Sequence, residues 1–261
     1  MPGMFRRTVA TVLAACCLPL VATAANSAPT APSTPSASST VPVVWSGTTW
    51  LAKNSPVLKA GPAPNYWLGT PDNVEVDAEG NLHLVTQKIL GRWYCAAITS
   101  TKSDYGYGTY RFVMSTPLQN FDPNAVVGMF TYNSAPANGH QEIDVELSRW
   151  GVPSPTAPNA QYVVQPWRRS KDHIRHFLAP VASGMTYEFT WAPNGVTFKL
   201  YNGTTPDAPV IRTWRTKAVP GEPTDGIHVN LNMWLMQAHP PYNGTKQEAV
   251  FQSFTYTPAA S

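Results

Sequence analysis

Three of the fifteen acidic residues in this chain stand at alternate positions of one short segment, HQEIDVELSRWG, residues 140–151. The acidic residues are Glu142, Asp144 and Glu146, and the residues that follow them are Ile143, Val145 and Leu147. This alternation predicts a β-strand, in which residues two apart share a face, so the carboxylates stand together opposite the apolar side chains. Such a row is unusual, because Asp and Glu are depleted in strands and no Lys or Arg lies among them to relieve the repulsion.

A pair of carboxylates is the usual equipment for hydrolysing a glycosidic bond. A retaining enzyme needs them about 5 Å apart, whereas four residues of a strand span about 13 Å. The distance closes if both side chains lean inward from a strongly curved strand, so the motif predicts a concave sheet with a cleft. Asp144, between them, would hydrogen-bond a neighbour and hold the ionisation states of the pair apart. Repulsion from Glu142 and Asp144 is expected to raise the pKa of Glu146 above the value of about 4.3 for a free Glu. A metal site and a solvated outer face are the alternatives, although hard cations usually take ligands from loops.

The rest of the chain supplies strands that could form such a sheet. Ten segments with a period of two begin at residues 73, 81, 109, 126, 142, 161, 186, 196, 228 and 250. Turn residues separate them, and Pro193-Asn194-Gly195 is a strong hairpin signal. Because no segment has a convincing helical period, we expect an all-β fold, a curved two-sheet β-sandwich or β-jelly roll with a concave substrate cleft.

The N-terminus predicts export. Residues 1–24 have a basic start, an apolar run and a small-residue cleavage site, which are the features of a secretory signal peptide. Cys16 leaves open the alternative of lipoprotein anchoring. Residues 25–42 are rich in Pro, Ser, Thr and Ala and read as a linker, so residues 43–261 are the expected domain. We therefore expect a secreted protein, extracellular or periplasmic, with no membrane association after signal removal.

Charge and cysteine content limit the partners. Removal of residues 1–24 takes away Arg6 and Arg7 and no acid, so the formal charge falls from +3 to +1. No cluster of Lys and Arg predicts a nucleic-acid-binding face. The mature chain keeps only Cys95, which cannot form an internal disulfide and is expected in the core. We expect a monomer whose partner is a polysaccharide.

Several segments resemble glycoside hydrolase family 16. Glu-Ile-Asp-Val-Glu is similar to the signature of that family, and the resemblance extends over nearly the whole mature domain. The segments that carry it are NVEVDAEGNLHLVT, YGYGTYRFVMS, GMFTYNSAPANGHQEIDVEL, YEFTWAPNGVTFKLYNG and NLNMW. The five-residue spacing of the motif is similar to that of lichenase-type and transglycosylase members. The resemblance implies a curved jelly roll and retaining endo-hydrolysis of a polysaccharide.

The resemblance also implies roles for individual residues. Glu142 would be the nucleophile, Glu146 the general acid/base and Asp144 the assisting carboxylate. The implied substrate-binding residues are Trp234, Asn232, Tyr132 and Asn65. For Trp234 the residue chemistry agrees, because stacking on the apolar face of a sugar needs an exposed aromatic side chain. The other tryptophans considered are expected to pack in the interior: Trp50, Trp67, Trp93, Trp191 and Trp214.

One departure limits the choice of substrate. Lichenase-type members carry a Glu and an Arg on the strand after the position of Cys95, whereas this chain reads CAAITS there. We therefore expect a β-glucan without fixing its linkage. A transglycosylase with the same residues and a non-catalytic carbohydrate-binding jelly roll are the alternatives. No cofactor or metal is expected, and the sequence does not indicate a structural calcium ion.

Overall fold

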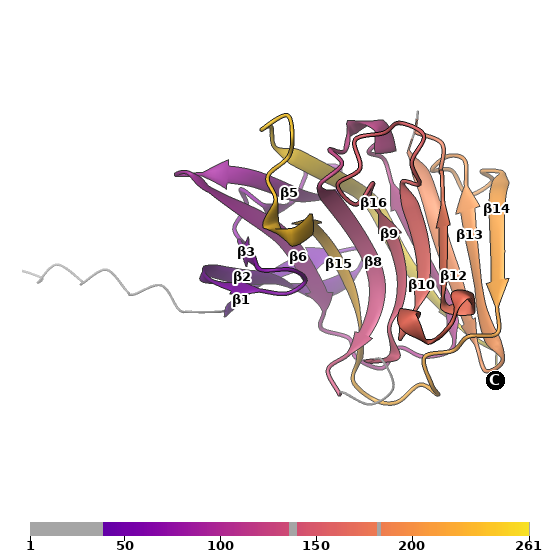
Figure 1. The fold of residues 1–261 in the computed structure, drawn as a ribbon. Coiled ribbons are helices and arrows are strands. Elements are labelled where there is room, and N and C mark those ends of the chain that lie inside the picture. The colour runs from indigo at the N-terminus through magenta and orange to yellow at the C-terminus, as the bar shows by residue number, and fades with distance from the viewer. Residues whose placement is uncertain (1–38, 136–139, 182–183, 261) are drawn as a thin grey trace, which may run out of the picture. The chain divides into compact units, whose positions relative to one another are not determined.

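The computed structural model describes residues 39–135, 140–181 and 184–260. This part of the chain forms sixteen β-strands and short 3₁₀ turns, with no α-helix (Figure 1). The prediction of an all-β fold is confirmed. In the same residues, no helix is long and apolar enough to cross a membrane. The predicted signal peptide lies outside the described residues, and the first strand begins at Ser39, so residues 39–42 of the predicted linker are paired in a sheet.

Most strands belong to two layers. The first layer, called here the cleft sheet, has the order β11-β10-β9-β8-β15-β6-β2-β1, and its strands curve strongly (Figure 1). Its strands are β1 (Ser39–Trp45), β2 (Thr48–Ala60), β6 (Arg92–Ser100), β8 (Ala125–Asn133), β9 (Ile143–Leu147), β10 (Ala160–Val164), β11 (Ile174–Phe177) and β15 (Ile227–Leu235). The short strand β3 (Asn65–Trp67) pairs with β2 and with β6.

The second layer, called here the outer sheet, has the order β4-β5-β16-β7-β12-β13-β14. Its strands are β4 (Val74–Val76), β5 (Leu82–Ile89), β7 (Gly108–Met114), β12 (Met185–Ala192), β13 (Gly195–Tyr201), β14 (Val210–Thr216) and β16 (Gln247–Pro258). The β5–β6 hairpin joins the two layers. The predicted Pro193-Asn194-Gly195 hairpin connects β12 to β13, where Ala192 pairs with Gly195.

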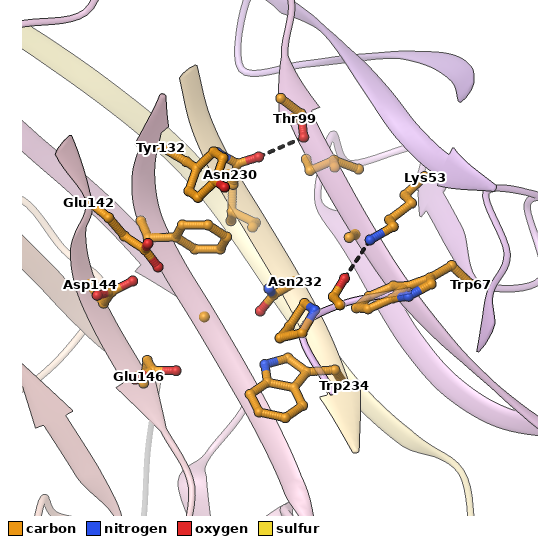
Figure 2. Close-up of a pocket in the computed structure, with 17 residues that line it drawn as sticks. Lys53, Trp67, Thr99, Tyr132, Glu142, Asp144, Glu146, Asn230, Asn232 and Trp234 are labelled. Carbon is orange, nitrogen blue, oxygen red and sulfur yellow. Dashed lines mark hydrogen bonds between the residues drawn. The ribbon is translucent and has the colours of Figure 1, made fainter. Parts of the chain in front are cut away.

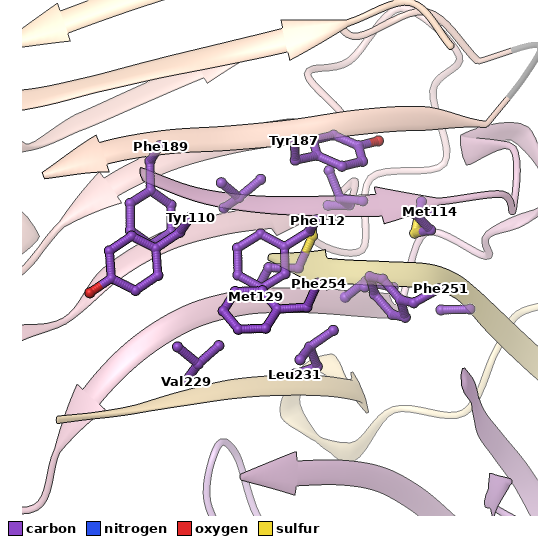
Figure 3. Close-up of a cluster of buried hydrophobic side chains, with 14 of the residues drawn as sticks. Tyr110, Phe112, Met114, Met129, Tyr187, Phe189, Val229, Leu231, Phe251 and Phe254 are labelled. Carbon is purple, nitrogen blue, oxygen red and sulfur yellow. The ribbon is translucent and has the colours of Figure 1, made fainter. Parts of the chain in front are cut away.

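The inward faces of the two sheets form one core. Alternate residues of β7, β12 and β16 meet alternate residues of β8 and β15 there (Figure 3). The labelled members are Tyr110, Phe112, Met114, Met129, Tyr187, Phe189, Val229, Leu231, Phe251 and Phe254. Cys95 is the only cysteine in the described residues and forms no disulfide, so burial of these large apolar side chains is the main source of stability there. Cys95 is buried with a free thiol, as predicted.

Candidate active site

Strand β9 and the residue before it place the three carboxylates along one side of a cleft. The apolar residues of β9 are at most 1% exposed and belong to the core; they are Ile143, Val145 and Leu147. The alternation therefore directs Glu142, Asp144 and Glu146 to the opposite, concave face, where they line a cleft of about 480 Å³ (Figure 2). This position contradicts the alternative of a solvated outer face.

Strand register brings cleft residues from neighbouring strands into rows. Glu146 lies between Gly128 of β8 and Gln161 of β10, and Gly128 in turn lies opposite Asn232 of β15. Asp144 lies between Phe130 of β8 and Val163 of β10. The strand neighbours of both acids are therefore neutral, and no cation from an adjacent strand compensates their charge.

Gly128 leaves room in the cleft floor between Asn232 and Glu146. A Cβ atom built on Gly128 would lie 2.5 Å from Asn232 Oδ1, closer than real Cβ contacts allow. Asn232 is 4% exposed, and its Oδ1 has no hydrogen-bond partner. An unpaired buried oxygen is costly unless a ligand satisfies it, so this acceptor is suited to a sugar hydroxyl.

Glu142 and Asp144 differ in how their surroundings act on them. Burial raises the pKa of Glu142, but a hydrogen bond with Asp144 and the nearby charge of His140 oppose that increase. The pKa of Asp144 lies well above its ordinary value, first because of burial and then because of the charges of Glu142 and Glu146. Asp144 therefore holds a proton more readily than Glu142, and its hydrogen bond favours the ionised form of Glu142.

Glu146 has the pKa of a group that can give a proton near neutral pH. Burial raises its pKa to about 7, opposed by a hydrogen bond from Gln161 and assisted by the charge of Glu142. Gln161 Nε2 donates to Glu146 Oε2 at 2.6 Å. The sequence suggested repulsion between the acids as the cause of a raised pKa, whereas burial is the larger cause.

Three of the four predicted substrate-binding residues line the cleft: Trp234, Asn232 and Tyr132. Tyr132 stacks on the ring of His140, with centroids 4.8 Å apart. Trp234 is only 9% exposed and packs edge-on against Trp150, so it is less open than a stacking platform was expected to be.

Asn65 does not line this cleft. Its side chain is 3% exposed, and its Nδ2 donates to the carbonyl oxygens of Pro62 and Leu235. The amide therefore ties the segment before β3 to the end of β15, so the structure gives Asn65 a local bracing contact away from the cleft.

Several residues that line the cleft or contact its acids were missed by sequence reasoning. Gln161 begins an alternating segment, and its position opposite Glu146 follows from the β9–β10 pairing. Asn230 precedes Asn232 by two residues and thus shares its face, which is a signal that the sequence did contain. Lys53 gave no signal, because it reaches the cleft through the pairing of β2 with β6. In the described residues, no group of His, Cys, Asp and Glu side chains is placed to hold a metal ion.

Comparison with known proteins agrees with the fold. The model of the family described as Glycosyl hydrolases family 16 matches residues 63–248, which include the whole of β9. A search of curated proteins found no significant match.

Solved structures with the same fold share little sequence. A Bacillus licheniformis β-glucanase aligns with a TM-score of 0.57 and 21% identity over 80% of this chain and 92% of its own. A prokaryotic β-1,3-1,4-glucanase from a mouse hindgut metagenome aligns with a TM-score of 0.54 and 20% identity over 80% of this chain and 93% of its own. An immunostimulatory antigen and pseudo β-1,3-glucanase of Mycobacterium tuberculosis aligns with a TM-score of 0.60 and 16% identity over 81% of this chain and 91% of its own. At these identities the likeness shows the fold, and the active residues must be argued from this chain.

Proposed function

Because the chain belongs to glycosyl hydrolases family 16 and is thus a glycosidase, we propose that it is a secreted, endo-acting, retaining hydrolase of a β-glucan. The observation that carries the mechanism is the row of three carboxylates in the cleft, in which burial raises every pKa but a hydrogen bond with Asp144 and the charge of His140 oppose the increase at Glu142. One group suited to attack and one suited to proton transfer are what retaining hydrolysis requires.

In the first step, the ionised Glu142 attacks the anomeric carbon while Glu146 protonates the leaving glycosidic oxygen. The bond from carbon to that oxygen breaks, and an ester forms between Glu142 and the sugar. Formation of the ester removes the charge of Glu142, which lowers the pKa of Glu146, so Glu146 can then accept a proton from water. Water attacks the anomeric carbon, and Glu142 leaves as a carboxylate.

The other cleft residues support this chemistry. Protonated Asp144 hydrogen-bonds Glu142 and keeps the nucleophile ionised, while Gln161 holds Glu146 in place through its 2.6 Å hydrogen bond. Asn232, Tyr132 and Trp234 contact the sugar. Because the cleft runs over several strands of the cleft sheet, the middle of a chain can lie across it, which supports endo-cleavage.

The β-glucan is supported by the structural neighbours described as β-glucanases. The neighbour described as a pseudo β-1,3-glucanase supports a second candidate, a carbohydrate-binding jelly roll without turnover. A transglycosylase would use the same residues and pass the glycosyl group to a sugar instead of water.

A reducing-sugar assay of the secreted protein over lichenan, laminarin, xyloglucan, agarose and carrageenan tests the proposal. We expect new reducing ends on one β-glucan, oligomeric products, and a β anomer as the first product in NMR spectra. An α anomer would exclude retention. Larger oligosaccharides without new reducing ends would indicate transglycosylation, and binding without any cleavage would indicate the non-catalytic alternative.

A further inference from the structure

Lys53 lies in the cleft at the end formed by β2 and β3. Leu51 pairs with Thr99 and Ala52 with Ile98 across β2 and β6, so Lys53 follows on the same face as Leu51 and Thr99. It lines the cleft together with Ala97 and Thr99 (Figure 2).

The ammonium group of Lys53 is held in place. Its Nζ lies 4.4 Å from the centroid of the Trp67 ring and donates a hydrogen bond to the carbonyl oxygen of Gly61. Trp67 is fully buried, and its Nε1 donates to Ala60, so the ring is a fixed support. The ammonium therefore lies over one face of the buried ring. This end of the cleft therefore presents a cation instead of an apolar surface.

Lys53 is the only cationic side chain among the described residues that line the cleft. Figure 2 places it across the cleft from the three carboxylates. Between Lys53 on β2 and Glu146 on β9 lie four inter-strand steps, roughly 19 Å along the sheet at the usual strand spacing. No ion pair joins Lys53 to a carboxylate in the part of the chain that the structure describes, and burial lowers its pKa. A partly desolvated ammonium without a counter-charge binds an anion more strongly than an exposed one.

A second donor in the same cleft has no partner. Thr99 Oγ1 donates to Asn230 Oδ1 at 2.6 Å, which leaves the buried Nδ2 of Asn230 without an acceptor. Lys53 also has N–H donors to spare, because an ammonium carries three and the hydrogen bond to Gly61 uses one. Lys53 on β2 and Asn230 on β15 thus each offer an unpaired donor to the cleft, whereas β9 offers carboxylates.

We propose that Lys53 binds an anionic substituent, a carboxylate or a sulfate, on a sugar of the substrate away from the bond that is cleaved. This inference rests on the proposed function and adds a substrate class to it, an acidic β-glycan.

The test uses the β-glucan that the secreted protein cleaves best, compared with carboxymethylated and sulfated forms of that polymer at matched substitution. The variants are Lys53→Met, which keeps the stem over Trp67 and removes the charge, and Lys53→Arg, which keeps the charge. Lys59→Met is the matched control, because Lys59 is exposed, contacts Tyr66 and does not line the cleft. The readouts are kcat/KM at low and high NaCl, and retardation in affinity gels that contain each polymer.

We expect the wild type to favour at least one anionic polymer over the neutral one by about tenfold, with the advantage lost in high salt. Lys53→Met should abolish that preference, Lys53→Arg should keep most of it, and Lys59→Met should not change it. An equal loss on neutral and anionic polymers would assign Lys53 a structural role, and a wild-type preference for the neutral polymer would also overturn the inference. The gels report preference without turnover, so a protein that binds anionic glucan through Lys53 but cleaves nothing would contradict the proposed function alone. The carboxymethyl and sulfate arms identify which anion is recognised.

Discussion

Glu188 on the outer sheet and the three acids on the cleft sheet are carboxylates in one sandwich with opposite surroundings. Glu188 is 7% exposed and lies in register between Arg111 of β7 and Lys199 of β13. Arg111 and Lys199 each lie 3.2 Å from its oxygens, and the hydroxyl of Tyr201 donates to it at 2.9 Å. Glu146, in register between Gly128 and Gln161, has no cation beside it.

Glu188 is an acid that the fold pairs with two cations, whereas the three cleft acids have no ion pair in the described part of the chain. A buried carboxylate is tolerated when cations and hydrogen bonds compensate for lost hydration, as they do at Glu188. At the cleft, burial raises the pKa of all three carboxylates, which favours protonation, and a nearby cation, His140, opposes this at Glu142 alone. Groups that a protein keeps at such a cost are candidates for chemistry.

The largest expected effect comes from Glu142→Gln set against Glu188→Gln. Glu142→Gln removes the nucleophile while keeping its shape, so kcat should fall by at least about 10³-fold with little change in Tm. Glu188→Gln removes a charge from a paired cluster, so Tm should fall while kcat stays within about tenfold of wild type. The two variants are compared by steady-state kinetics and by thermal unfolding followed with circular dichroism.

A similar fall in kcat for Glu142→Gln and Glu188→Gln would contradict the distinction between the two sites, because activity would then depend on the general stability of the fold. Residual activity of Glu142→Gln within about tenfold of wild type would remove Glu142 from the role of nucleophile.

Most of what the sequence predicted correctly came from the alternation of apolar and polar residues, because this pattern depends only on neighbours in the sequence. Ile143, Val145 and Leu147 are buried as expected. The alternation alone therefore predicted that Glu142, Asp144 and Glu146 share the opposite face. Strands whose two faces are similarly exposed were missed. In β14, for example, Val210 and Ile211 are 47% and 43% exposed although adjacent residues of a strand point to opposite faces.

Long-range pairing carried the information that local sequence lacked. Asn65 resembled a ligand-binding residue, but its amide donates to Leu235, 170 residues away, which no local pattern indicates. Lys53 enters the cleft only because β2 pairs with β6. The raised pKa of Glu146 was expected from charge repulsion, but burial by the surrounding sheet is its main cause.

A smaller effect is expected from Asp144→Asn. The substitution replaces the carboxylic O–H donor beside Glu142 with a weaker amide N–H donor of the same size, so the ionised form of the nucleophile is favoured less. We expect kcat to fall by about 10- to 100-fold, less than for Glu142→Gln, and the acid limb of the pH profile to move. The product anomer should remain the same in NMR spectra. An inverted anomer would mean that Asp144 takes part in bond formation.

Gln161→Leu should shift the alkaline limb of the activity profile. Gln161 stabilises the charged form of Glu146, so its removal should raise the pKa of Glu146 from about 7 and move the alkaline limb to higher pH. The profile of kcat/KM between pH 4 and pH 10 measures this shift. Gln87→Leu is the control, because Gln87 lies on β5 and donates to the carbonyl of Asp72 outside the cleft. An unchanged alkaline limb in Gln161→Leu would assign that limb to another group.

The smallest effect is a change in stability with pH that is expected at Glu146. The pKa of Glu146 is raised from an ordinary 4.5 to about 7 in the folded state, so the folded state holds a proton that the unfolded chain has lost between these values. Its favourable contribution is complete below about pH 4.5 and is lost as pH rises through 7. Glu146→Gln stays neutral, so its Tm should match that of wild type at pH 4 and exceed it by a few degrees at pH 8. Glu188→Gln, which removes a paired charge, should instead lower Tm at pH 8. Differential scanning calorimetry from pH 4 to pH 8 measures both curves, and a Glu146→Gln difference that stays flat over this range would show that the folded state does not raise the pKa of Glu146.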